Sequence, residues 1–269
     1  DIKGVGGAVI KKIEKEIDET SGVLGKSLES WSWLESLLFF CTKINSTAVK
    51  AMVSVGALSF LNSNRTKMLY EYNIVSSFTN KELGWIRKFL LDNKNQNHIS
   101  VIDAMNLMMG QPVGRAGAIA NKKRFESFKS IAQSLEKPPY VLEDTPEWVA
   151  NKEEFLLGIP VTCTKIDACD TSSANATCRD IVHRNAGDTP LVAVQLGSIR
   201  QIQVKNGPSR GEEMAFLNVS DSTCALDCVI FPESWRSYKD LLTEGNTLMI
   251  SGTLDKKKES FIVQKVWQI

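Results

Sequence analysis

Three glycines near the N-terminus, with lysines before and after them, form a pattern that could bind an anion. Glycine permits the positive φ angles and the close backbone approach that a tight turn before a helix requires. The backbone N–H groups of such a turn and the dipole of the following helix favour a phosphate oxygen. An ordinary loop followed by a solvated helix would have the same composition. The residues predicted to bind phosphate are Lys3, Gly4, Val5, Gly6, Gly7, Lys11 and Lys12.

A second group, in the C-terminal third of the chain, combines cationic side chains with an aromatic ring. The alternating run from Met214 to Val219 places Phe216 on the face opposite Ala215 and Leu217. Phe216 is therefore either a platform for base stacking or, as is commoner for phenylalanine, a core residue. Nearby cations could follow a nucleic-acid backbone or could simply be solvated. The residues predicted to bind DNA here are Lys205, Arg210, Phe216, Arg236, Lys256, Lys257 and Lys258.

Cysteine and histidine side chains in a polar stretch between these two groups could hold a zinc ion. Cys163, Cys169, Cys178 and His183 are separated by five, eight and four residues. Structural zinc sites usually contain paired ligands two to four residues apart, so this spacing fits no standard zinc finger. Reduced thiols scattered through a cytosolic protein are the alternative interpretation. No residue is predicted to bind a metal or to act in catalysis.

Short strands must position the C-terminal group. Alternating segments at 191–204, 214–219, 247–254 and 260–267, with a further run that ends at Phe231, predict five strands. A short helix is expected around 238–242, between the third and fourth strands. Five strands with one helix in this position are the pattern of an OB-fold β-barrel, a fold that commonly binds oligonucleotides or oligosaccharides.

Helices must position the N-terminal group. Apolar residues at helical spacing predict helices at 8–17, 80–91, 99–109, 122–135 and 147–158. The basic run 122–124 begins one of them and either contacts nucleic acid or forms a solvated face. The predicted fold class is therefore α+β, with a helical domain at 1–140, a linker helix and irregular segment at 141–187, and an OB-fold domain at 188–269.

The composition is that of an ordinary globular protein, with 43% hydrophobic and 23% charged residues among 269 and a net charge of +1. Residues 1–135 carry 18 Lys and Arg against 12 Asp and Glu, so the positive charge is concentrated in the helical part. No apolar run approaches the roughly 18 residues of a membrane helix, and no signal-peptide pattern is present. These observations predict a cytoplasmic location without a membrane.

Three separated blocks of the chain resemble one family. Residues 210–216, 219–221 and 229–232 look like the OB domain of bacterial and phage DNA polymerase III alpha subunits. Residues 2–6, with the helix that follows them, are similar to the helix-hairpin-helix region of that family. Leu37 to Lys43 resembles its short helix, and Asn45 to Arg65 resembles its second hairpin, which is expected to serve mainly in packing.

The resemblance implies that the chain is the DNA-binding C-terminal portion of a replicative polymerase. The hairpins would hold duplex DNA by its phosphates, and the OB domain would contact single-stranded template or a partner. The catalytic palm of the family lies upstream of the matching blocks. The intact enzyme would be a nucleotidyltransferase that uses Mg²⁺, whereas this fragment is expected to have no cofactor and no activity by itself.

Other partners and other functions remain open from the sequence. A sliding clamp or other replisome subunits are further partners that the resemblance implies. Family members often carry a clamp-binding peptide in the interval that corresponds to residues 74–145. Gln133 to Leu135 begins such a peptide but lacks its aromatic end. The alternatives to a polymerase fragment are a stand-alone module that binds single-stranded nucleic acid and a scaffold that docks replication proteins.

Overall fold

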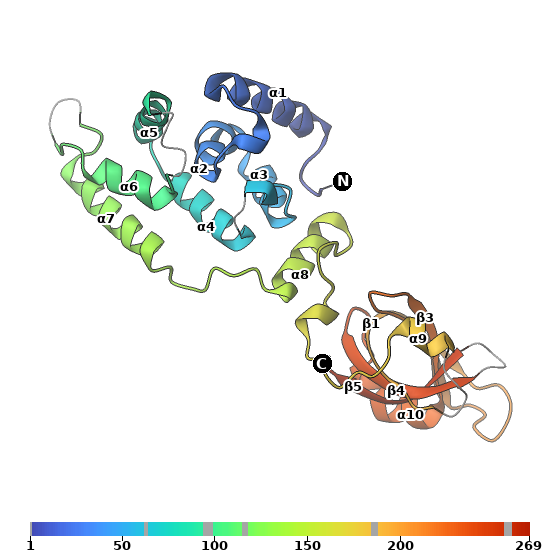
Figure 1. Ribbon diagram of the computed structural model, residues 1–269. Coiled ribbons are helices and arrows are strands. Elements are labelled where there is room, and N and C mark those ends of the chain that lie inside the picture. The colour runs from blue at the N-terminus through green and yellow to red at the C-terminus, as the bar shows by residue number, and fades with distance from the viewer. Residues whose placement is uncertain (1, 62–63, 94–98, 115–117, 184–187, 256–259) are drawn as a thin grey trace. The chain divides into compact units, whose positions relative to one another are not determined.

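The computed structural model describes residues 2–61, 64–93, 99–114, 118–183, 188–255 and 260–269. It divides into two compact units, Asp1–Ile159 and Pro160–Ile269, each with its own hydrophobic core. Figure 1 shows the first as helices and the second as a barrel of strands. No helix in the described residues is both long and apolar enough to cross a bilayer.

The first unit is built from helices, and a side chain caps the start of each α-helix after the first. The helices are α1 (Gly7–Leu24), α2 (Trp33–Glu35), α3 (Ser46–Ser54), α4 (Arg65–Val75), α5 (Asn80–Asp92), α6 (Val101–Met109), α7 (Lys122–Glu136) and α8 (Pro146–Leu157). Thr79 and Ser100 each form a capping box with an acidic residue three positions later. Thr145 caps α8, and Pro146 occupies its first turn.

The core of this unit forms around a buried segment that follows α2. A π-helical turn at Ser36–Phe40 continues α2, and Leu37, Leu38 and Phe40 within it are fully buried. Met105 and Met108 of α6 are also buried, so these methionines fill the core. Helix α1 is longer than predicted. It continues to Leu24, which is buried, and ends at Gly25 in the left-handed conformation.

The second unit contains a closed five-stranded barrel, which confirms the predicted OB-fold architecture and the α+β class (Figure 1). The strands are β1 (Leu191–Gln203), β2 (Glu213–Ser220), β3 (Ala225–Ile230), β4 (Thr247–Asp255) and β5 (Ser260–Gln268), in the order β1-β2-β3-β5-β4. Only the β3–β5 pairing is parallel among these contacts. Alternate residues of each strand fill the barrel interior.

Two details of the barrel differ from the expectations. The helix between β3 and β4 is α10 (Pro232–Tyr238), several residues earlier than predicted, because Pro232 is well suited to the first turn of a helix. A 3₁₀ turn at Lys239–Leu241 follows it. The barrel also has irregular registers beside Gly197 and at Gly252, where a Cβ would come within 1.9 Å of the Ile262 carbonyl oxygen. Glycine is therefore required at 252.

The residues that precede the barrel belong to its core. Helix α9 (Cys178–His183) packs against β3, and Cys178 and Ile181 are fully buried among the barrel residues. The Asp221 carboxylate, in the β2–β3 turn, accepts a 2.7 Å hydrogen bond from the backbone N–H of Cys178. Ala176 pairs with Val192 as an isolated parallel bridge. The compact unit therefore begins before residue 188, the predicted start of the OB-fold domain. The alternation of residues in the strands could not predict this, because it carries no information about a short helix that packs against the barrel.

Candidate nucleic-acid interface

A groove of about 610 Å³ lies on the outer face of the barrel, over strands β1, β2, β3 and β5 and the end of β4. Strand register brings two rows of side chains together there. The first row runs from Arg200 through Phe216 and Val229 to Ile262, which are cross-strand neighbours in that order. The second row runs from Ser198 through Asn218 to Asp227. The groove thus combines an aromatic and apolar row with a polar one.

The first row presents a cation over an exposed ring. Phe216 is 36% exposed, whereas its neighbours Ala215 and Leu217 are buried in the barrel interior. The guanidinium carbon of Arg200 lies 5.0 Å from the centroid of the Phe216 ring, within the range of a cation–π contact. Phe216 is therefore a surface residue and not part of the barrel core. Arg200 was not among the predicted site residues.

The polar row is held by a cross-strand hydrogen bond. The side-chain amide of Asn218 donates to Oδ1 of Asp227 across a distance of 2.8 Å. Both residues line the groove, beside Ser198. A second exposed ring, Phe231, also lines the groove, just after the end of β3, and it was missed by the sequence reasoning as well. A carboxylate, an amide, a guanidinium and two rings are suited to hydrogen bonding and stacking with nucleic-acid bases.

The predicted cations of the barrel do not all meet in the groove. Lys205 and Arg210 are exposed in the loop from β1 to β2, which turns at Gly207 and Gly211 with positive φ angles, and neither is among the lining residues. Arg236 lies in a separate depression near Trp235, where its guanidinium is 3.6 Å from a carboxylate oxygen of Glu212. The exposed ion pair contributes little to stability.

The lysine run of the β4–β5 connection cannot be placed. Lys256, Lys257 and Lys258 lie outside the residues that the structure describes. Asp255 and Ser260, the nearest described residues on either side of it, both line the groove.

The N-terminal glycine turn is attached to the end of α8. The backbone N–H of Lys3 donates to the Leu156 carbonyl at 2.8 Å, and the Lys3 ammonium lies 4.3 Å from the Phe155 ring centroid. Gly4 has a φ angle of +90°, which only glycine adopts readily. Gly6 is the N-cap of α1 and has no side-chain cap.

The remaining residues of this predicted site divide between core and surface. The Val5 side chain is buried, so its role is to hold the turn against the unit. Gly6 and Gly7 are exposed, as are Lys11 and Lys12 in the first two turns of α1. The turn therefore presents exposed backbone and two cations at the start of an 18-residue helix.

The second hairpin, between α3 and α4, is filled by interactions within the protein. Gly56 has a φ angle of +76°, and a Cβ there would lie 2.6 Å from the guanidinium of Arg65. That guanidinium is 2.7 Å from the buried Glu153 carboxylate. At the start of α4, the Asp144 carboxylate accepts hydrogen bonds from the backbone N–H groups of Arg65 and Thr66. The Asp144 carboxylate thus takes up backbone N–H groups at the start of α4.

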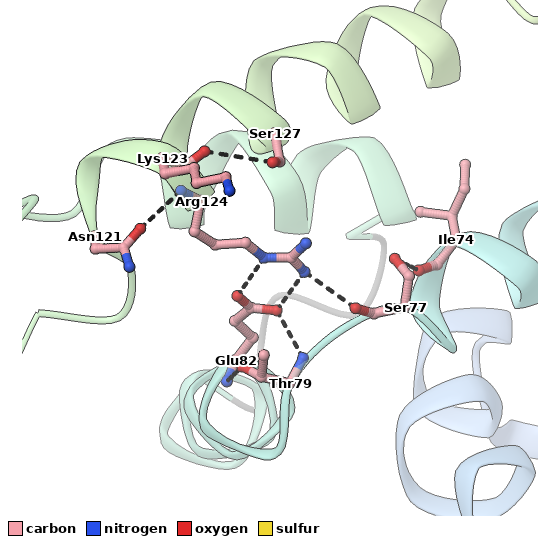
Figure 2. Close-up of polar contacts among 8 residues, drawn as sticks. All are labelled: Ile74, Ser77, Thr79, Glu82, Asn121, Lys123, Arg124 and Ser127. Carbon is pink, nitrogen blue, oxygen red and sulfur yellow. Dashed lines mark hydrogen bonds and ion pairs between the residues drawn. The ribbon is translucent and has the colours of Figure 1, made fainter.

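The basic run 122–124 contains one cation that is paired within the protein and two that are exposed. Arg124 donates from Nε and Nη2 to the two carboxylate oxygens of Glu82, each at 2.7 Å, and from Nη2 to the Ser77 carbonyl (Figure 2). Asn121 caps α7 through the Arg124 N–H. Arg124 therefore ties α7 to α5, and the cations left exposed at this helix start are those of 122 and 123.

The cysteines predicted as alternative zinc ligands lie in different environments. Cys163 and Cys169 are partly exposed, whereas Cys178 is buried in the barrel core. Burial, together with the neighbouring Asp221 carboxylate, raises the pKa of the Cys178 thiol to about 12, which disfavours the thiolate that zinc requires. The His183 side chain is outside the described part of the chain, and within that part no group of three His, Cys, Asp or Glu side chains could hold a metal ion.

Comparison with known proteins gives matches to the barrel. The family described as OB-fold nucleic acid binding domain, of the tRNA anti-codon type, matches residues 192–267. DNA polymerase III subunit alpha of Staphylococcus aureus (strain MSSA476) is 35% identical over 75 residues, which are 28% of this chain and 7% of that protein. The Streptococcus pyogenes subunit is 37% identical over 67 residues, 25% of this chain and 6% of that protein.

A solved structure also aligns with part of the chain. The second OB-fold domain of replication protein A from Methanococcus maripaludis covers 33% of this chain and 91% of its own, with 14% identity and a TM-score of 0.26. The sequence matches to the polymerase subunits span less than a tenth of those proteins' length. The expected resemblance is confirmed for the OB region: residues 192–267 match the OB-fold nucleic acid binding family and are similar to part of DNA polymerase III subunit alpha.

Proposed function

We propose that the barrel binds single-stranded DNA in the groove of its outer face, within a protein related to DNA polymerase III subunit alpha. The observation that carries this proposal is the exposed Phe216 ring with the Arg200 guanidinium beside it. Bases stack on aromatic rings in a sequence-tolerant way, and arginine contributes both charge and cation–π contact. The similarity of the OB region to a polymerase subunit supports DNA as the nucleic acid.

The helical unit is proposed to bind duplex DNA through the turn at residues 4–7. The support is an exposed, uncapped helix start with Lys11 and Lys12 in its first turns. Backbone N–H groups at such a start attract phosphate without reading sequence. In this proposal the turn acts as one half of a helix-hairpin-helix. The chain would work as part of a DNA-directed DNA polymerase in the cytoplasm, with Mg²⁺ supplied to the catalytic part and a sliding clamp or other replisome subunits as partners.

Fluorescence anisotropy with labelled single-stranded and duplex oligonucleotides tests the proposal on the full chain. Phe216→Ala is expected to weaken binding of the single strand by about fivefold to a hundredfold, since stacking on one ring contributes roughly 1–3 kcal/mol. Duplex binding should not change. The matched control is Trp267→Ala, because Trp267 is 45% exposed on β5 but is not among the residues that line the groove.

The same measurements distinguish a barrel that binds single-stranded DNA from a scaffold that binds only proteins. Equal loss of affinity in the Phe216 and Trp267 variants, or no binding of any single strand at low salt, would reject the groove as a DNA site. Low salt is the decisive condition because phosphate attraction is strongest there. A scaffold that binds only proteins would be the better description in that case.

A further inference from the structure

The polar row of the groove lies beside the stacking row at a spacing that suits a base. Asn218 follows Phe216 by two residues on β2, and Asp227 precedes Val229 by two residues on β3. Residues two apart on a strand share a face and lie about 6.6 Å apart. A base stacked over the first row therefore directs one edge toward Asn218 and Asp227.

The hydrogen bond between Asn218 and Asp227 determines which hydrogen-bonding groups remain for the edge of a base. A carboxylate only accepts hydrogen bonds, so the Asn218 amide nitrogen must face Asp227. The side-chain oxygen of Asn218, Oδ1, then lies on the other side of the amide, 3.6 Å from where a Cβ of Gly197 would be. Because Gly197 has no Cβ, this oxygen is not covered by a side chain at that position. The pair retains two kinds of acceptor beyond this hydrogen bond, the amide oxygen and the second carboxylate oxygen, and both residues line the groove.

We infer that Asn218 and Asp227 read one base edge and favour bases that carry an exocyclic amino group over thymine. This inference rests on the proposed binding of single-stranded DNA in the groove. Cytosine, adenine and guanine each have an amino group that donates to a carboxylate or amide oxygen. Thymine has a single ring N–H between two carbonyl oxygens, so acceptors in the protein face acceptors in the base. The groove therefore selects for base chemistry, in addition to holding the strand.

The experiment compares oligo(dC) and oligo(dT) of equal length, bound to the full chain. The wild-type protein is expected to bind oligo(dC) about tenfold more tightly, the discrimination typical of one well-placed base contact. In Asp227→Asn, the amide that replaces the carboxylate can donate to thymine, so the preference should fall to about one. Affinity for oligo(dT) should rise at the same time. Comparing the dC:dT ratio between variants cancels differences between the free strands.

Asp240→Asn is the matched control, since Asp240 is exposed on the 3₁₀ turn at Lys239–Leu241 and does not line the groove. It removes the same charge, so both strands should gain equally and the dC:dT ratio should stay at the wild-type value. Asn218→Ala is a second measurement, because it frees the Asp227 carboxylate from its fixed orientation and should also reduce the ratio. Binding of both strands without preference, or an unchanged ratio in Asp227→Asn, overturns base reading while single-strand binding stands. Absence of binding to either strand overturns both.

Discussion

Single residues decide which of the two glycine turns is exposed and which is covered. The second turn is closed, because Arg65 fills the space beside Gly56 and Asp144 occupies the N–H groups at the start of α4. At the first turn, a Cβ built on Gly6 meets nothing within 4 Å, and its φ angle of −81° is ordinary for any residue. Gly4 differs, since its positive φ angle strains every other residue.

Gly6 is therefore the position at which a side chain can test phosphate contact without disturbing the fold. Gly6→Val is expected to weaken duplex binding alike for all sequences, because the added side chain blocks close approach to the backbone N–H groups. Duplex titrations over a salt series measure the effect. The control is Gly22→Val in the same helix, where a Cβ also meets nothing within 4 Å. Equal affinities in the two variants would argue against phosphate binding at this turn.

At the scale of elements, two polar contacts join segments that are distant in sequence. The first is the contact of Arg124 on α7 with Glu82 on α5 (Figure 2). Although burial raises the pKa of Glu82, the hydrogen bonds from Arg124 and Thr79 outweigh this effect and lower it. The Glu82 side chain is only 1% exposed, so it depends on its partners.

Arg124→Leu is expected to destabilise the helical unit by about 3–5 kcal/mol, because it leaves a buried carboxylate without its counter-ion. Thermal and urea unfolding measure this loss. The double variant Arg124→Leu with Glu82→Leu should recover much of the stability, since no buried charge remains. Lys129→Leu is the control, because its ion pair with Glu126 is exposed and should contribute little. A single variant as stable as the control would show that the contact is dispensable.

The second contact is the Asp221 carboxylate, which joins α9 to the β2–β3 turn. It accepts hydrogen bonds from the backbone N–H groups of Cys178, Thr223 and Cys224 and from the Thr223 hydroxyl. Burial raises the pKa of Asp221, but these hydrogen bonds together lower it below its usual value. A carboxyl with a lowered folded-state pKa stabilises the protein above its unfolded pKa, and this stability is lost as the pH falls through the folded value.

Asp221→Asn should therefore reduce the stability of the barrel unit by about 1.5–3 kcal/mol at pH 7, the usual value of hydrogen bonds to a charged group. The difference from the wild type should begin to shrink once the pH falls below about 4, the pKa of an unfolded Asp, and should disappear as the pH falls through the lower folded-state pKa of Asp221. Unfolding midpoints measured between pH 7 and pH 3 give this comparison. A difference that does not change with pH would assign the loss to geometry and not to charge.

At the scale of the molecule, the two units have separate cores, and the barrel core extends upstream of its first strand. Cys178 and Ile181 of α9 contribute to it, together with the bridge from Ala176 to Val192. A domain boundary drawn at the first strand would remove these contacts and leave the Asp221 turn without its partner.

The fragment 160–269 is accordingly expected to fold alone with a cooperative transition. The fragment 188–269 should be less stable by at least about 1.5–3 kcal/mol, the cost of losing one buried Ile side chain. Circular dichroism during urea unfolding compares the two. If both unfold at the same urea concentration, α9 is an attachment that does not support the barrel.

The sequence by itself determined the local features, because their causes are local. Alternation in β2 identified Ala215, Leu217 and Val219 as interior and Phe216 as outward-facing, although it left open whether that ring was covered. Helical spacing of apolar residues located α5, α7 and α8 within one or two residues of their observed ends. Alternation in β1 can likewise indicate that Arg200 faces outward, but it does not show that Phe216 on β2 is its cross-strand neighbour.

Only the tertiary structure decided which outward residues meet. Arg200 faces Phe216 because the register of β1 and β2 shifts between Leu196 and Ser198, and Ile262 joins their row because β5 pairs with β3 in parallel. A shift of one residue reverses the face of every side chain that follows, so register cannot be inferred from residue types alone. The roles of Arg124, Asp144 and Asp221 depend on partners more than 40 residues away in sequence. Such pairings arise from the packing of whole elements, which no local pattern specifies.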